Sequence, residues 1–87
     1  MMKQYEKILK ALANRRRLAI IKYLKQKKEA AVTEISGAIA LSFKATSRHL
    51  AVLYNAEILE KNQRSLAVYY SIVSKLPTMA KLVITEL

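Results

Sequence analysis

One stretch of the chain brings together side chains that could bind an anionic partner. It holds two hydroxyl groups, two cations and the single histidine: Ser42, Lys44, Ser47, Arg48 and His49. Basic side chains displace counterions from a phosphate backbone, and an arginine can pair with O6 and N7 of guanine. Hydroxyl and imidazole groups add hydrogen bonds to phosphates or base edges. The expected chemistry is hydrogen bonding and charge pairing with a polyanion.

The sequence offers little support for catalysis or metal binding. Cysteine and aspartate are absent, so His49 lacks the partners for a four-ligand metal site. The sequence offers no nucleophile with a base, no paired carboxylates and no glycine-rich phosphate loop. We therefore expect neither an enzyme nor a bound cofactor or metal.

The composition indicates one compact, helix-rich domain over residues 1–87. Hydrophobic residues make up 53% of the chain, with a single glycine and a single proline, and 87 residues are too few for two cores. The apolar stretches are far shorter than the roughly 20 residues that cross a bilayer, and no secretory signal is recognisable. We expect a cytoplasmic protein with no membrane partner.

The net charge of +10 favours a polyanionic partner. Ten of the sixteen cations lie within residues 1–28, where only Glu6 opposes them. Two interpretations of this basic segment stay open. Its cations could contact RNA or a partner protein directly, or they could form a solvated face that supplies only long-range attraction.

Hydrophobic periodicity predicts two helices in the basic segment. The first covers residues 3–13, and the second follows Asn14, a good N-cap, and ends in the polar run 25–29. Each helix carries one apolar face: Tyr5, Ile8, Leu9 and Leu12 in the first, and Leu18, Ile20, Ile21 and Leu24 in the second.

A short helix and a longer one follow, joined by a tight connection at residues 40–41. Residues 33–39 form the short helix, in which Thr33 and Ser36 give a partial capping pattern. Ser42 is placed to cap the longer helix, residues 43–55.

The longer helix has an apolar side and a polar side. Thr46, Leu50 and Leu53 form its inward stripe, so Lys44 and Arg48 point outward. Two helices joined in this way are typical of a helix-turn-helix, whose second helix fits the DNA major groove.

Two apolar runs, residues 58–61 and 66–72, then predict a β-hairpin. Alternation within the second run suits a half-buried strand. The hairpin would carry Lys61, Gln63 and Arg64 towards phosphates or the minor groove. A last helix is expected after Pro77, with Met79, Leu82, Val83 and Leu87 sharing one face. The fold class is mainly α with a small β-hairpin wing, a winged helix-turn-helix.

Several short motifs resemble the ArsR-type family of winged-helix transcriptional repressors. They are Leu12-Ala13-Asn14-Arg15-Arg16-Arg17-Leu18-Ala19-Ile20-Ile21, Leu41-Ser42, Ser47-Arg48-His49-Leu50, Val52-Leu53 and Val68-Tyr69-Tyr70. The likeness spans residues 8–72. It implies a homodimeric regulator of double-stranded DNA, with the first and last helices at the dimer interface and residues 42–55 reading an operator half-site.

The chain departs from that family at two places. Metal-sensing members carry a Cys-x-Cys pair where this chain has Ala30, Ala31 and Val32, so no Cys-based metal sensor is expected. Glu57 stands where the family usually has glycine, at a position suited to the left-handed conformation that a side chain penalises. We expect a helix end of different length or shape there.

Some side chains allow more than one role. Arg15, Arg16 and Arg17 begin a helix, where cations are unfavourable, so a phosphate could compensate them. Arg17 lies near the buried stripe and could instead form a structural pair with Glu34 or Glu57. His49 could contact DNA or could simply pack at the side of its helix. A dimer would place its half-sites about one helical turn apart. The alternatives to a DNA-binding function are an RNA-binding or protein-docking module that uses the basic first two helices, and an interaction domain without a nucleic-acid partner.

Overall fold

The computed structural model of the protein describes residues 2–87. Its helices are α1 (Met2–Leu12), α2 (Arg15–Lys27), α3 (Val32–Ile39), α4 (Phe43–Asn55) and α5 (Thr78–Glu86), and its strands are β1 (Glu29–Ala31), β2 (Leu59–Arg64) and β3 (Ala67–Ile72). This order confirms the predicted succession of four helices, a hairpin and a last helix. It adds the short strand β1, which the sequence did not predict.

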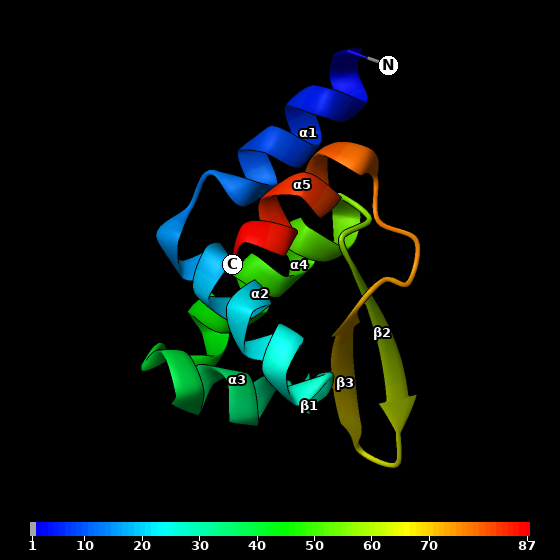
Figure 1. Cartoon of the computed structure of the whole chain (residues 1–87). Helices are drawn as coiled ribbons and strands as arrows, with labels where there is room; N and C mark the ends of the chain where they lie inside the picture. Colours follow the sequence, from blue (N-terminus) through cyan, green and yellow to red (C-terminus); the bar gives the residue numbers. More distant parts are fainter. Residues whose placement is uncertain (1) are drawn as a thin grey trace.

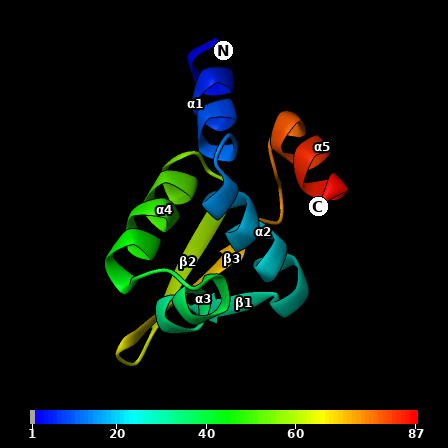
Figure 2. The same cartoon turned by 90° about the vertical axis from the view of Figure 1, so that its left-hand side faces the viewer.

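The helices form the body of the molecule, and the β2–β3 hairpin, which we call the wing, extends away from it (Figure 1). α2 contacts α1, α3 and α4, so it lies at the centre of the helical body. α1 contacts α5 at the end of the molecule opposite the tip of the wing (Figure 1, Figure 2). None of the described helices is long and apolar enough to cross a bilayer.

A three-stranded antiparallel sheet anchors the wing to the body, in the order β1-β3-β2. β1 pairs Glu29 with Ser71, and the wing pairs Arg64 with Ala67 across a two-residue turn. Leu66 was predicted to begin the second strand but lies in this turn, fully exposed at 101%. Ser65 before it has φ 58°, the sign that the first central residue of a type II′ hairpin turn requires.

Side chains cap the N-termini of α2 and α4, as predicted. Asn14 Oδ1 accepts hydrogen bonds from the backbone N–H of Arg16 at 2.9 Å and of Arg17 at 3.1 Å. The predicted capping by Thr33 was wrong, because α3 begins one residue earlier, at Val32. The carboxylate of Glu34 instead accepts the backbone N–H of Ala31 at 2.9 Å, which joins the start of α3 to the end of β1.

Aliphatic side chains from every helix and from β1 and β2 meet in one core. The largest of those that are almost completely buried are Ile8, Ile20, Ile21, Leu24, Ile35, Leu50, Leu53, Ile58 and Leu59. α5 contributes Ala80 and Ile84, while Leu82 points outward and is 66% exposed. Leu82 was predicted to share the face of Met79 and Val83, which do pack on the core. The apolar residues of α5 therefore occupy two different sides of the helix.

The end of α4 keeps the shape that a glycine would favour, although the residue is Glu57. Its φ is 62°, in the left-handed region. Its N–H donates to Tyr54 O at 3.0 Å, and the N–H of Ile58 donates to Leu53 O at 3.0 Å. These two bonds form a Schellman motif, closed by the buried pair Leu53 and Ile58. The expected change in helix length or shape at Glu57 was wrong.

This conformation predicts that Glu57→Gly stabilises the protein. Glycine removes the steric cost of a side chain at positive φ, which exceeds the extra backbone entropy that glycine loses on folding, so the free energy of unfolding should rise by about 1 kcal/mol. Urea denaturation measures the change. Glu60→Gly, at an exposed position in β2, is the control and should lower stability. A loss of stability in Glu57→Gly would contradict the account.

Candidate nucleic-acid interface

α4 presents a polar face to solvent because its opposite face is locked in the core. Thr46, Leu50 and Leu53 are buried, as the predicted inward stripe requires. Lys44 and Arg48, four residues apart, are both exposed. Residues four apart on a helix lie on the same side, so the two cations share one face.

The other predicted α4 residues border this cationic face. Ser42 is exposed at the N-cap, where its Oγ accepts the backbone N–H of Ala45 at 3.1 Å. Its hydroxyl proton remains able to donate to a phosphate oxygen. Ser47 and His49 are half-buried beside the cations. The structure thus brings all five predicted α4 residues to the N-terminal two turns of one helix.

The wing residues are held in contacts of their own. The ammonium of Lys61 lies 4.4 Å from the centre of the Tyr54 ring at the end of α4. The guanidinium of Arg64 lies 4.0 Å from the centre of the Tyr69 ring and forms a 2.7 Å ion pair with Glu29. Its side chain remains 49% exposed, so phosphate could compete for it.

Gln63 is exposed on the wing between the two cations. Of the three wing residues, Lys61 contacts α4, through the Tyr54 ring near the end of that helix. The β2–β3 hairpin thus carries a second group of polar side chains, on a different element from the first.

Arg17 joins α2 to α1 and to His49 on α4. From the first turn of α2, its Nε donates to Ala11 O at 2.6 Å and its Nη2 to Lys10 O at 2.9 Å, at the end of α1. Its Nη1 lies 3.1 Å from His49 Nδ1 on α4. The predicted structural role of Arg17 is therefore correct, but the predicted partners Glu34 and Glu57 are wrong. Sequence spacing gave no signal for these contacts, because the partners are two backbone carbonyls and a side chain 32 residues away.

The contact with Arg17 determines which ring nitrogen of His49 carries the proton. A guanidinium can only donate, so Nδ1 must accept and the neutral ring carries its proton on Nε2. Burial lowers the pKa of His49 below its ordinary value of 6.5, and the positive charges of Arg17 and Arg16 lower the pKa further. His49 thus both packs at the side of α4 and keeps an N–H donor on its other nitrogen.

No group of three or more His, Asp or Glu side chains that could hold a metal occurs in residues 2–87. Ala30, Ala31 and Val32 lie where β1 meets α3, and Ala30 is fully buried. These apolar side chains offer no ligand at that junction.

The family model described as bacterial regulatory protein, arsR family, matches residues 14–61. The match runs from the N-cap of α2 to β2, more than half of the chain, and includes the whole of α3 and α4. The chain belongs to the arsR family. It is a DNA-binding transcriptional regulator, and the polar face of α4 lies on the second helix of the family's helix-turn-helix.

Solved structures of similar proteins extend this likeness over the whole fold. HlyU from Vibrio cholerae is 33% identical, with a TM-score of 0.81 over 98% of this chain and 88% of that one. A homodimeric winged helix-turn-helix DNA-binding domain from Mycobacterium bovis is 28% identical, with a TM-score of 0.83 over 98% of this chain and 75% of that one. The transcriptional repressor PagR of Bacillus anthracis is 27% identical, with a TM-score of 0.80 over 98% and 93% of the two chains.

The lowered pKa of His49 predicts a stability change between pH 7.5 and 5.5. As the pH falls through 6.5, the unfolded chain takes up the proton more readily than the folded ArsR-family domain, so the free energy of unfolding decreases. His49→Gln removes the only histidine while keeping an acceptor for Arg17. Urea unfolding at both pH values should show a smaller pH dependence in the variant. An equal or larger dependence in His49→Gln would refute the assignment.

Proposed function

We propose that this ArsR-family protein represses transcription as a homodimer that places two α4 helices in successive major grooves of an operator. The observation that carries the proposal is the exposed pair Lys44 and Arg48 on a helix whose other side is fixed in the core. Half-sites would lie about one helical turn apart. The protein would act in the cytoplasm, and residues 1–87 would form a single DNA-binding domain without catalytic activity.

The α4 residues divide into base-reading and phosphate-binding roles in this proposal. Arg48, exposed in the second turn, is suited to pair with a guanine edge, and Lys44 and Ser42 are suited to the flanking phosphates. Ser47 and the Nε2–H of His49 would donate to base edges or to phosphate oxygens. Because His49 is tied to Arg17, its donor would be oriented before DNA arrives.

The wing would add contacts that do not depend on base sequence. Lys61, Gln63 and Arg64 would contact phosphates beside the α4 helix or in the minor groove. The guanidinium of Arg64 would turn partly from Glu29, its partner in an exposed ion pair, towards a phosphate. Such contacts strengthen binding to any duplex and weaken it as the salt concentration rises.

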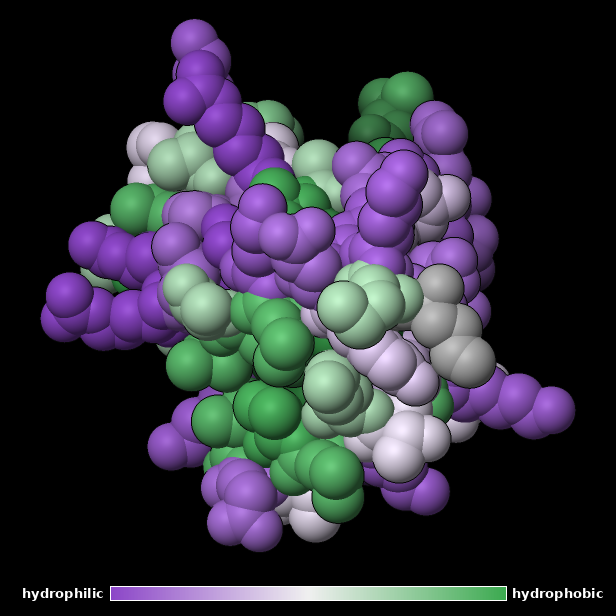
Figure 3. All heavy atoms as spheres, turned by 90° about the horizontal axis from the view of Figure 1, so that it is seen from above, coloured by the Kyte–Doolittle hydropathy of each residue, from purple (hydrophilic) through white to green (hydrophobic). Residues whose placement is uncertain are grey.

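The first and last helices offer the surface for the second protomer. Met2, Tyr5 and Leu9 on α1 are exposed, as is Leu82 on the neighbouring α5. Figure 3 shows a hydrophobic area surrounded by hydrophilic side chains on the end of the molecule that carries these helices. Exposed apolar patches of this kind mark protein interfaces. The homodimeric M. bovis domain supports the dimer, and the repressor PagR supports repression.

Arg48→Ala tests the base-reading role. The variant should lose about 1–3 kcal/mol of binding free energy on a selected duplex and bind related sequences with less discrimination. Arg64→Ala should weaken all duplexes alike. Gel shifts against a duplex enriched from a random pool and its scrambled form measure both effects.

Lys27→Ala, which removes a charge from the far end of α2, is the matched control and should change binding much less than either variant. Equal losses on every duplex for Arg48→Ala and Arg64→Ala would contradict the division of roles.

Leu82→Glu tests the dimer surface. A carboxylate placed in an apolar interface loses its hydration without gaining a partner, so the variant should run as a single chain where the unmodified protein runs as a dimer. Light scattering after gel filtration measures the mass. Leu66→Glu, at the exposed tip of the wing, is the control and should remain dimeric. A dimeric Leu82→Glu would exclude this interface.

A further inference from the structure

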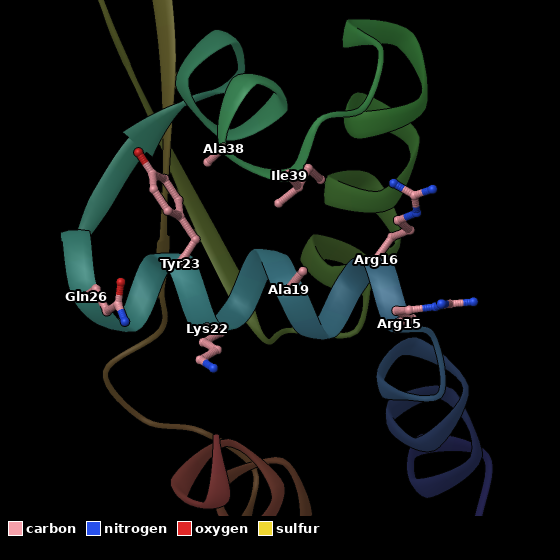
Figure 4. Close-up of a pocket in the computed structure, with 8 residues that line it drawn as sticks. All are labelled: Arg15, Arg16, Ala19, Lys22, Tyr23, Gln26, Ala38 and Ile39. Carbon is pink, nitrogen blue, oxygen red and sulfur yellow. The ribbon is translucent and has the colours of Figure 1, made fainter.

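A groove of about 470 Å³ lies between α2 and α3, outside the α4 face and outside the surface shared by α1 and α5. Its lining residues are Arg15, Arg16, Ala19, Lys22, Tyr23, Gln26, Ala38 and Ile39. Figure 4 shows Ala19 and Tyr23 rising from α2 towards α3, with Ala38 and Ile39 across from them and the two arginines at the start of α2. This volume lies within the range of small-molecule sites.

The cationic end of the groove carries charge that nothing nearby neutralises. Its lining contains three cations and no acidic residue. Within residues 2–87, Arg15, Arg16 and Lys22 form no salt bridge, and the first turn of α2 has no acidic side chain. The helix dipole adds partial positive charge at this turn. An anion bound at the start of α2 would gain from the charges of Arg15 and Arg16 and from the dipole, whereas Lys22 lies further along α2 and points away from α3 (Figure 4).

Arg17 differs from its two neighbours because the carbonyl oxygens of Lys10 and Ala11 already occupy its guanidinium. Arg15 and Arg16 are exposed and have no such acceptors in the described part of the chain. Arg17 is therefore held by contacts within the fold, whereas Arg15 and Arg16 remain able to bind a ligand.

Beyond the arginines the groove is lined mainly by apolar side chains, with Lys22 and Gln26 of α2 also at its border. Ala19 and Ala38 leave space because their side chains are single methyl groups, and half-buried Ile39 and Tyr23 border it. Arg16 and Tyr23 are seven residues apart on α2, a distance of about 10 Å along the helix axis. A hydrocarbon chain of medium length spans that distance.

We propose that this groove binds a small organic anion with an apolar tail. The carboxylate lies at Arg15 and Arg16, and the tail runs along Ala19, Ala38 and Ile39 towards Tyr23. Ile39 is the last residue of α3, directly before Ala40, whose φ of 55° starts the turn into α4. A ligand between α2 and α3 therefore touches the element that sets the position of the α4 helix. Any effect of the ligand on operator binding rests on the proposed function, but ligand binding itself does not.

Octanoate is the probe for the test, and the readout is the backbone amide spectrum of the full chain without DNA. Saturable shifts should cluster at residues 15–26 and 38–39. Butanoate should bind much more weakly, because each methylene withdrawn from water tightens binding by roughly threefold to fourfold. Octanol should also bind more weakly than octanoate, because it lacks the charge.

Two variants probe the two ends of the groove. Arg16→Gln removes one anion-binding cation, and Ala38→Leu fills the apolar floor at an exposed helical position. Each should weaken octanoate binding at least tenfold, with thermal unfolding confirming the fold. Lys27→Gln, a cation of the same helix outside the groove, should bind octanoate as the unmodified protein does.

Three results would overturn the proposal. Octanoate could cause no saturable shifts, it could shift residues of α1 and α5 instead, or octanol could bind as tightly. If Arg16→Gln lost duplex affinity but bound octanoate as tightly as the unmodified protein, these cations would be assigned to the DNA backbone. Because octanoate binding is measured without DNA, its failure leaves the proposed DNA function untouched.

Discussion

Burial of one side of α4 is the constraint on which the rest of the structure depends. Leu50 and Leu53 are completely buried among residues of the other helices and the sheet, and α4 contacts α1, α2, α3 and β2. A helix fixed on that side cannot rotate without exposing leucine to water, at a cost of about 2 kcal/mol for each such side chain. The polar face with Arg48 is therefore held outward, at a fixed orientation to the wing.

Arg17 complements this apolar constraint with a polar one. Its guanidinium satisfies carbonyl oxygens at the end of α1 and orients the His49 ring on α4. α1 also carries the apolar surface proposed for the dimer, so a single side chain joins that helix to α4, the helix proposed to bind DNA. The three consecutive arginines of α2 thus have different surroundings: Arg17 is tied into the fold, while Arg15 and Arg16 line an open groove.

The sequence correctly predicted the features that depend on residues close together in the chain. The Asn14 and Ser42 caps and the inward stripe of α4 follow from side-chain type and helical spacing, and all were found. β1 could not be predicted, because its three residues show no periodicity and its strand conformation depends on pairing with the distant strand β3. The partners of Arg17 were missed for a related reason, since tertiary packing brings them together. Leu82 was misplaced because α5 is apolar on two sides, so its pattern does not reveal which side is buried.

The central claim is that the outward face of α4 contacts the duplex. Titration with a duplex enriched from a random pool, followed through backbone amide shifts, tests it most directly. The account predicts the largest changes at residues 42–49, with smaller ones at the wing. Changes confined to α1 and α2, with α4 unaffected, would contradict the claim and move the contact surface to the basic first two helices.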